Sequence, residues 1–145
     1  MMAYAYRAVM SIEVTLQQLA QTLTRYRFAY LVTVGDDARA HVLAVSTTLA
    51  NDTLLVTDLG RTTRANVAAH PSVTFVWPPT DPSDYSLIVD GVASMRDDEL
   101  VVAPTRAVLH RPAPPRPTST GDGCESDCVE LPVTAEASNS SAACG

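Results

Sequence analysis

The sequence predicts a mainly β protein: a six-stranded antiparallel barrel with one or two flanking helices and a disordered C-terminal tail. Short runs rich in Val, Leu and Thr are separated by tight polar turns, which is typical of antiparallel sheets. Only one long and one short helical pattern accompany these runs, so the strand–helix alternation of a parallel sheet is absent. We favour closure into a small barrel because closure removes exposed sheet edges.

The first expected element is an amphipathic helix over Ile12–Leu23. Its apolar residues recur at helical spacing over about three turns. Ser11 is the expected N-cap, and Glu13 lies in the first turn, where a negative charge is favourable. The apolar stripe of this helix should lie on the body of the domain.

Six β-like runs follow, separated by turn residues. Gly91 interrupts the fifth run, which indicates a bulge or a sharp bend, and Pro104 in the sixth run indicates an edge position or a bulge. A short helix over Arg61–His70 separates the third run from the fourth and ends before Pro71. The expected strands are Tyr30–Val34, Ala40–Thr48, Thr53–Thr57, Ser72–Trp77, Ser86–Met95 and Glu99–His110.

Composition divides the chain into an N-terminal extension (1–11), a folded domain (12–112) and a disordered tail (113–145). The tail is rich in Pro, Ser and Gly and cannot bury enough apolar surface to offset the entropy of ordering. All three cysteines, Cys124, Cys128 and Cys144, lie in it. They are expected as reduced thiols, and the spacing of the first two leaves a tail-bound metal on a structural dimer as one alternative.

The formal net charge of −6 and the pI near 4.8 argue against a nucleic-acid-binding surface. Every basic residue except histidine is arginine, so no lysine can bind phosphate or form a Schiff base. No apolar run approaches the ~20 residues needed to cross a bilayer. The first ten residues are too short and too weakly apolar for a signal peptide. We therefore expect no membrane partner and a cytoplasmic location.

The turn between the third strand and the short helix is the strongest candidate for a ligand site. It carries Arg61, Thr62, Thr63 and Arg64 at the expected start of a helix. Backbone N–H groups, hydroxyls and positive charge gather at such a position, which suits a phosphorylated ligand. The alternative is that the hydroxyls cap the helix and the arginines are solvated.

The order of these elements, together with Thr57, the Arg61–Asn66 segment, Pro71 and Asp90-Gly91, resembles the pyridoxamine 5′-phosphate oxidase-like flavin-binding split barrels. More narrowly, it is similar to their small actinobacterial members, which use FMN or the deazaflavin F420. The resemblance covers residues 16–112. It implies a homodimer with two flavin sites at the subunit interface. It also implies hydride transfer to or from a small organic substrate in the interface groove.

The resemblance also implies which residues bind the cofactor. The strand that begins with His41 runs beside the isoalloxazine ring, while Thr57 and the Arg61–Arg64 turn hold the phosphate and ribityl chain. Ser86 matches a polar residue placed against the cofactor, and Asn66 either touches the ligand or makes a structural bond to a loop. The implied cofactor-binding residues are His41, Val42, Leu43, Ala44, Thr57, Arg61, Thr62, Thr63, Arg64, Asn66 and Ser86.

Two departures from the family pattern matter. Thr63 occupies the place where a lysine commonly pairs with the phosphate, so Arg61 or Arg64 must supply the charge. Only Arg96–Asp98 joins the last two expected strands, where larger relatives carry a helix and substrate-binding residues. Pyridoxine phosphate oxidation itself is therefore not expected.

The predicted folded part offers no nucleophile–base pair, no metal-ligand cluster and no carboxylate pair at catalytic spacing. This is compatible with flavin chemistry, which takes place on the cofactor while the protein binds and orients it. It also suits a second hypothesis, a non-enzymatic split barrel that sequesters a flavin or haem. His41 either faces the ring or is a strand histidine whose polar atoms are satisfied within the protein. Trp77 either stacks on a ligand or packs in an interface.

Overall fold

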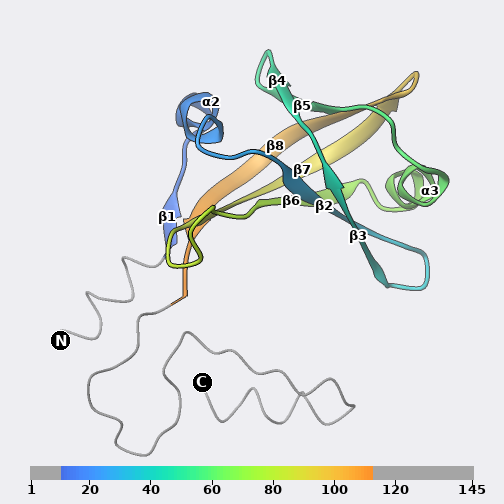
Figure 1. The fold of residues 1–145 in the computed structure, drawn as a ribbon. Helices are drawn as coiled ribbons and strands as arrows, with labels where there is room; N and C mark the ends of the chain where they lie inside the picture. Colours follow the sequence, from blue (N-terminus) through green and yellow to red (C-terminus); the bar gives the residue numbers. More distant parts are fainter. Residues whose placement is uncertain (1–10, 113–145) are drawn as a thin grey trace, which may run out of the picture. The chain divides into compact units, whose positions relative to one another are not determined.

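The computed structural model describes residues 11–112, and Ser11–Arg111 forms one compact unit. Figure 1 shows a curved sheet with α2 near one end and α3 near the other. Residues 1–10 of the predicted extension, the predicted tail and all three cysteines lie outside the described residues. The elements are β1 (Ser11–Glu13), α2 (Leu16–Leu23), β2 (Ala29–Val34), β3 (Ala40–Val45), β4 (Thr48–Ala50), β5 (Thr53–Val56), α3 (Arg61–Ala69), β6 (Ser72–Trp77), β7 (Ser86–Arg96) and β8 (Glu99–His110).

The eight strands in the described part form one antiparallel sheet in the order β3-β2-β6-β7-β8-β5-β4, with β1 paired to β8. The predicted mainly β, antiparallel class is therefore confirmed. The sheet is not closed. Its two ends, β3 and β4, are joined in sequence by Ser46 and Thr47 alone, which span at most about 11 Å. The ends of the sheet therefore approach each other, as in a split barrel.

The strand count differs from the six expected strands for two local reasons. The run expected over Ala40–Thr48 is divided after Val45, and its last residue begins the separate strand β4. β1 is an additional short strand that forms where a helix was expected.

The start of the first helix was predicted wrongly. Ser11–Glu13 pairs with β8 instead of being helical, and α2 spans eight residues instead of three turns. Thr15 is the N-cap: its side chain accepts from the backbone N–H of Gln18, and the Gln18 side chain accepts from the backbone N–H of Thr15. This capping box satisfies two backbone donors at once, whereas Ser11 lies too far upstream to reach them.

The predicted irregularity at Gly91 and Pro104 is confirmed as a β-bulge. Asp90 pairs with Arg106, but Gly91 pairs with Pro104, which leaves Thr105 as the extra residue of β8. A Cβ atom on Gly91 would lie 2.5 Å from Cγ1 of Val102. Glycine is therefore required here for close approach of the two strands.

The core lies inside the curved sheet. α2 closes it with Leu19, and α3 closes it with Val67. Phe75 and Trp77 pack at 5.4 Å between ring centroids. Among the described residues, no helix is long and apolar enough to cross a bilayer. The largest fully buried apolar side chains are Phe75, Leu19, Leu31, Leu54, Leu87, Leu100, Val56, Val89 and Val102.

Candidate functional site

The candidate phosphate turn connects β5 to α3. Gly60 is the N-cap of α3, and no side chain caps this helix terminus. The backbone N–H groups of the first turn therefore have no side-chain acceptor, which leaves them available to an anion. Asp58 precedes the helix with φ of 60° and turns the chain sharply after β5. The start of α3 is thus an exposed, uncapped helix N-terminus.

Arg61, Thr62 and Thr57 lie on the solvent side of this turn. All three are exposed. Arg61 makes no ion pair or side-chain hydrogen bond with any residue of the described part. The Thr57 hydroxyl lies 3.4 Å from Oδ2 of Asp58. Among the described residues Arg61 is therefore a cation without an ion-pair partner beside an uncapped helix start, and Asp58 places one negative charge in the same turn.

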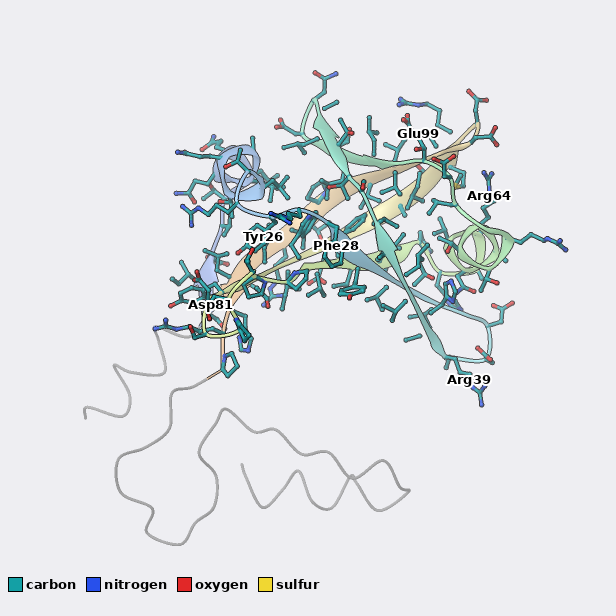
Figure 2. All side chains as sticks on the ribbon, in the orientation of Figure 1. Tyr26, Phe28, Arg39, Arg64, Asp81 and Glu99 are labelled. Carbon is teal, nitrogen blue, oxygen red and sulfur yellow. The ribbon has the colours of Figure 1, made fainter. Side chains whose placement is uncertain are left out.

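Arg64 holds the turn in shape. Its Nε donates to the carbonyl oxygen of Leu59 at 3.2 Å, and its Nη2 donates to Oδ1 of Asp98 at 3.3 Å. Asp98 belongs to the turn between β7 and β8, and Figure 2 shows Arg64 between α3 and the tip of that hairpin. This side chain therefore joins two segments distant in sequence, a role that sequence reasoning did not identify.

Thr63 and Asn66 face the interior. Their exposed fractions are 1% and 8%. Nδ2 of Asn66 donates to Oγ1 of Thr33 at 3.1 Å, and Thr33 is fully buried on β2. The hydrogen bond fits the structural alternative considered for Asn66, because it ties α3 to the sheet.

The strand expected beside the flavin ring, β3, is an edge of the sheet. It pairs with β2 on one side only. Val42 and Ala44 are exposed, while His41 and Leu43 are half-buried. His41 pairs with Thr33, the residue bonded to α3 through Asn66. β3 therefore starts near α3 and runs away from it.

Ser86 is not brought to the phosphate turn. It is the first residue of β7, whereas α3 is linked to the far end of the β7–β8 hairpin. The eleven residues of β7, Ser86–Arg96, span roughly 33 Å of strand. Within one chain, Ser86 and the Arg61–Arg64 turn lie at opposite ends of the sheet.

Two cavities lie near α2. Figure 2 shows two of their lining residues, Tyr26 and Asp81, on the side of the molecule away from Arg64. Tyr26 lines both cavities, and its hydroxyl donates to the carbonyl oxygen of Tyr85 at 2.9 Å. The first, of 510 Å³, is lined by Arg25, Tyr26, Pro79, Thr80, Asp81, Pro82, Asp84, Tyr85 and Leu109. The second, of 350 Å³, is lined by Ala20, Leu23, Thr24, Tyr26, Arg27, Ser46, Thr47, Leu49 and Trp77.

At this end of the molecule sequence reasoning singled out Trp77, as stacking on a ligand or packing in an interface, but it did not identify Tyr26 or Arg27. The signal was present in Tyr26-Arg27-Phe28, where an arginine stands between two aromatic residues just before a buried strand. Over residues 11–112, no group of three or more His, Cys, Asp or Glu side chains could hold a metal ion.

The fold is that of the pyridoxamine 5′-phosphate oxidase-like split barrels. An F420 reductase matches with a TM-score of 0.51 and 20% identity, over 60% of this chain and 93% of its own. A putative pyridoxamine 5′-phosphate oxidase from Listeria innocua matches with a TM-score of 0.54 and 15% identity, over 65% of this chain and 96% of its own. The FAD binding protein from Mycobacterium smegmatis matches with a TM-score of 0.52 and 22% identity, over 70% of this chain and 99% of its own.

No family model matches the sequence. Two uncharacterized proteins, one from Mycobacterium bovis and one from Mycobacterium tuberculosis, are each 42% identical over 137 residues. Each alignment covers 83% of this chain and 96% of the relative. The chain therefore belongs to the same family as these two mycobacterial proteins.

Proposed function

We propose that this protein is a homodimeric oxidoreductase that binds FMN or F420 and transfers hydride to or from a small organic substrate. The observation that carries the proposal is the start of α3, where Arg61 has no ion-pair partner among residues 11–112 and lies beside an uncapped helix N-terminus. Proteins with the same fold include an F420 reductase and FAD- and FMN-binding proteins, which supports a flavin-type cofactor here.

The residues of the turn fit a phosphate group. Arg61 supplies the charge that the missing lysine would provide, and a guanidinium can bind phosphate through two hydrogen bonds. Thr62 and Thr57 contribute exposed hydroxyls, and the first-turn N–H groups of α3 point toward the same place. Arg64 positions the turn through Leu59, and the buried Thr63 and Asn66 fix the orientation of the helix.

The edge strand β3 fits the ring of the cofactor. Its free edge leaves the backbone N–H and C=O groups of alternate residues within His41–Ala44 without a partner strand in the described part, because the others face β2. These groups can hydrogen-bond to the heteroatoms of an isoalloxazine or deazaflavin ring. When bound, such a cofactor supplies the hydride chemistry, so the chain itself needs only to hold and orient the reactants.

In the proposed homodimer, a second copy of the chain packs over the α3 turn and β3, and the cofactor lies in the groove between the two copies. Phe28, Tyr30, Val42 and Val92 are exposed by 37%, 40%, 54% and 50%. Tyr30 and Val42 lie on the outward face of the β2–β3 pair, and exposed apolar side chains on one sheet face indicate an interaction surface. A groove completed by a partner explains why neither cavity described above lies at the α3 turn, and Ser86 would then approach the cofactor from the other subunit.

The test is titration of FMN and of F420 with the purified full-length protein, followed by cofactor fluorescence. Arg61→Ala should weaken binding about tenfold or more, because hydrogen bonds to a charged group contribute about 1.5–3 kcal/mol. Arg25→Ala is the matched control: Arg25 is exposed but lies at the α2 end. Equal affinity of Arg61→Ala and wild type for both cofactors would refute the phosphate assignment. Tight binding without turnover of any quinone or enone would favour the sequestering alternative.

A further inference from the structure

The 350 Å³ cavity at the end of β3 has the composition of a binding site for an apolar anion. The apolar residues Ala20, Leu23, Leu49 and Trp77 line it together with Tyr26. Its volume falls within the range of small-molecule pockets, about 300–1,000 Å³. Thr24, Arg27, Ser46 and Thr47 add polar groups to this lining, and a few polar groups in a largely apolar pocket are the usual means of orienting a ligand.

Arg27 provides the positive charge. Its side chain is exposed and has no ion-pair or hydrogen-bond partner within residues 11–112. No carboxylate lines this cavity. The hydroxyls of Ser46 and Thr47 also lack a side-chain hydrogen bond within the described part, so they can donate to an oxyanion.

The neighbouring 510 Å³ cavity differs from the 350 Å³ cavity because carboxylates line it. Asp81 and Asp84 line it along with Arg25. Tyr26 forms the wall between the two, and its hydrogen bond to the carbonyl oxygen of Tyr85 holds that wall in place. Burial and the negative charge of Asp84 raise the pKa of the Tyr26 phenol above its ordinary value. A carboxylate ligand would thus be repelled from the first cavity and attracted to the second.

The cavity adjoins the strand proposed to border the cofactor ring. Ser46 lies two residues beyond Ala44, a distance of about 7 Å along an extended chain. β3 therefore leads from the α3 end, where the phosphate is proposed, to the mouth of this cavity. A ligand held there would lie at the end of the ring-bordering segment.

We propose that this cavity binds the organic substrate of the enzyme, and that this substrate is a small apolar carboxylate. Arg27, Ser46 and Thr47 bind its carboxylate, and Trp77 and Leu49 contact its apolar body. The part of this statement that calls the ligand a substrate rests on the proposed function; the binding itself does not.

Trp77 makes the binding measurable without any cofactor, because it is the only tryptophan of the chain. Cofactor-free protein is titrated with hydrocinnamate and, separately, with its neutral amide, and the tryptophan fluorescence is recorded. We expect hydrocinnamate to shift this fluorescence in a saturable manner and to bind more tightly than the amide. Arg27→Gln should weaken hydrocinnamate binding about tenfold and leave the amide unaffected.

Two further variants complete the test. Arg25→Gln removes an equally exposed arginine that lines only the other cavity, so it should bind hydrocinnamate like the wild type. Ala20→Phe fills the cavity from the exposed surface of α2 and should abolish binding of both probes. Equal loss in Arg25→Gln and Arg27→Gln, equal affinity for acid and amide, or no change in tryptophan fluorescence would overturn the proposal.

Cofactor titration separates this inference from the proposed function. Hydrocinnamate binding without FMN or F420 binding would refute the oxidoreductase and retain a carboxylate-binding cavity. Cofactor binding without any effect of hydrocinnamate would refute the cavity assignment alone. Arg27→Gln should leave the cofactor affinity unchanged, because Arg27 lines the 350 Å³ cavity and is not part of the α3 turn proposed to hold the phosphate.

Discussion

The hydrogen bond between Asn66 and Thr33 should be the main polar tie between α3 and the sheet. Asn66→Ala removes the donor and leaves the Thr33 hydroxyl, which is fully buried, without its partner. A lost hydrogen bond costs about 0.5–1.5 kcal/mol, and a buried polar group left unsatisfied costs about 1–3 kcal/mol. We therefore expect the free energy of unfolding to fall by about 2–3 kcal/mol.

Thr33→Val removes the acceptor instead and should cost about 1–2 kcal/mol, because the amide of Asn66 is then left without its acceptor. The double variant loses the same hydrogen bond only once and leaves neither group unsatisfied. Its cost should therefore be about 2–3 kcal/mol smaller than the sum of the two single costs.

Urea unfolding followed by the fluorescence of Trp77 measures all three changes. Gln17→Ala is the control: this exposed residue of α2 should change the free energy of unfolding by less than about 0.5 kcal/mol. If the costs of the two single variants simply add in the double variant, the hydrogen bond does not fasten α3. The assigned structural role of Asn66 would then be wrong.

Two further predictions concern the bulge and the cavity wall. Gly91→Ala would place a methyl group 2.5 Å from Cγ1 of Val102, so we expect a loss of about 1–3 kcal/mol in urea unfolding; an unchanged midpoint would contradict the required close approach. Burial and Asp84 raise the folded-state pKa of Tyr26 above the ordinary value near 10. Because the folded state holds the phenol proton more tightly than the unfolded chain does, Tyr26 makes a contribution to the free energy of unfolding. This contribution is fully present below pH 10 and is lost as the pH rises through the folded-state pKa. Tyr26→Phe should remove that alkaline loss in unfolding midpoints measured across this range, and an identical alkaline decline in the variant would exclude Tyr26 as its source.

Turns and bulges could be predicted because their causes are local. The bulge follows from a glycine in β7 and a proline in β8, two residue types that a regular ladder does not tolerate in mid-strand. The hairpin turn at Asp97 has φ of 54°, a conformation that the sequence marks by its two consecutive aspartates. The short helix also ends where Pro71 requires it to end.

The N-terminal region could not be predicted from the same kind of pattern. Ser11 and Thr15 are both acceptable N-caps, and the apolar spacing extends upstream of the true helix. Pairing of Ser11–Glu13 with Val108–His110 decides between them, because backbone hydrogen bonds to β8 replace those that a longer helix would make. The partner strand lies almost a hundred residues away, beyond the reach of any local pattern.

For the candidate site, too, some features followed from the sequence and others required the tertiary structure. The amino-acid sequence by itself determined that two arginines and two threonines stand at the start of a helix, a chemistry suited to phosphate. Only the tertiary structure decided which of them face solvent: Thr63 is buried, Arg64 is bonded to Leu59 and Asp98, and Arg61 is exposed without a counterion. The physical reason is that successive residues of a helix point in different directions, and the sheet against which α3 packs determines which direction is the interior.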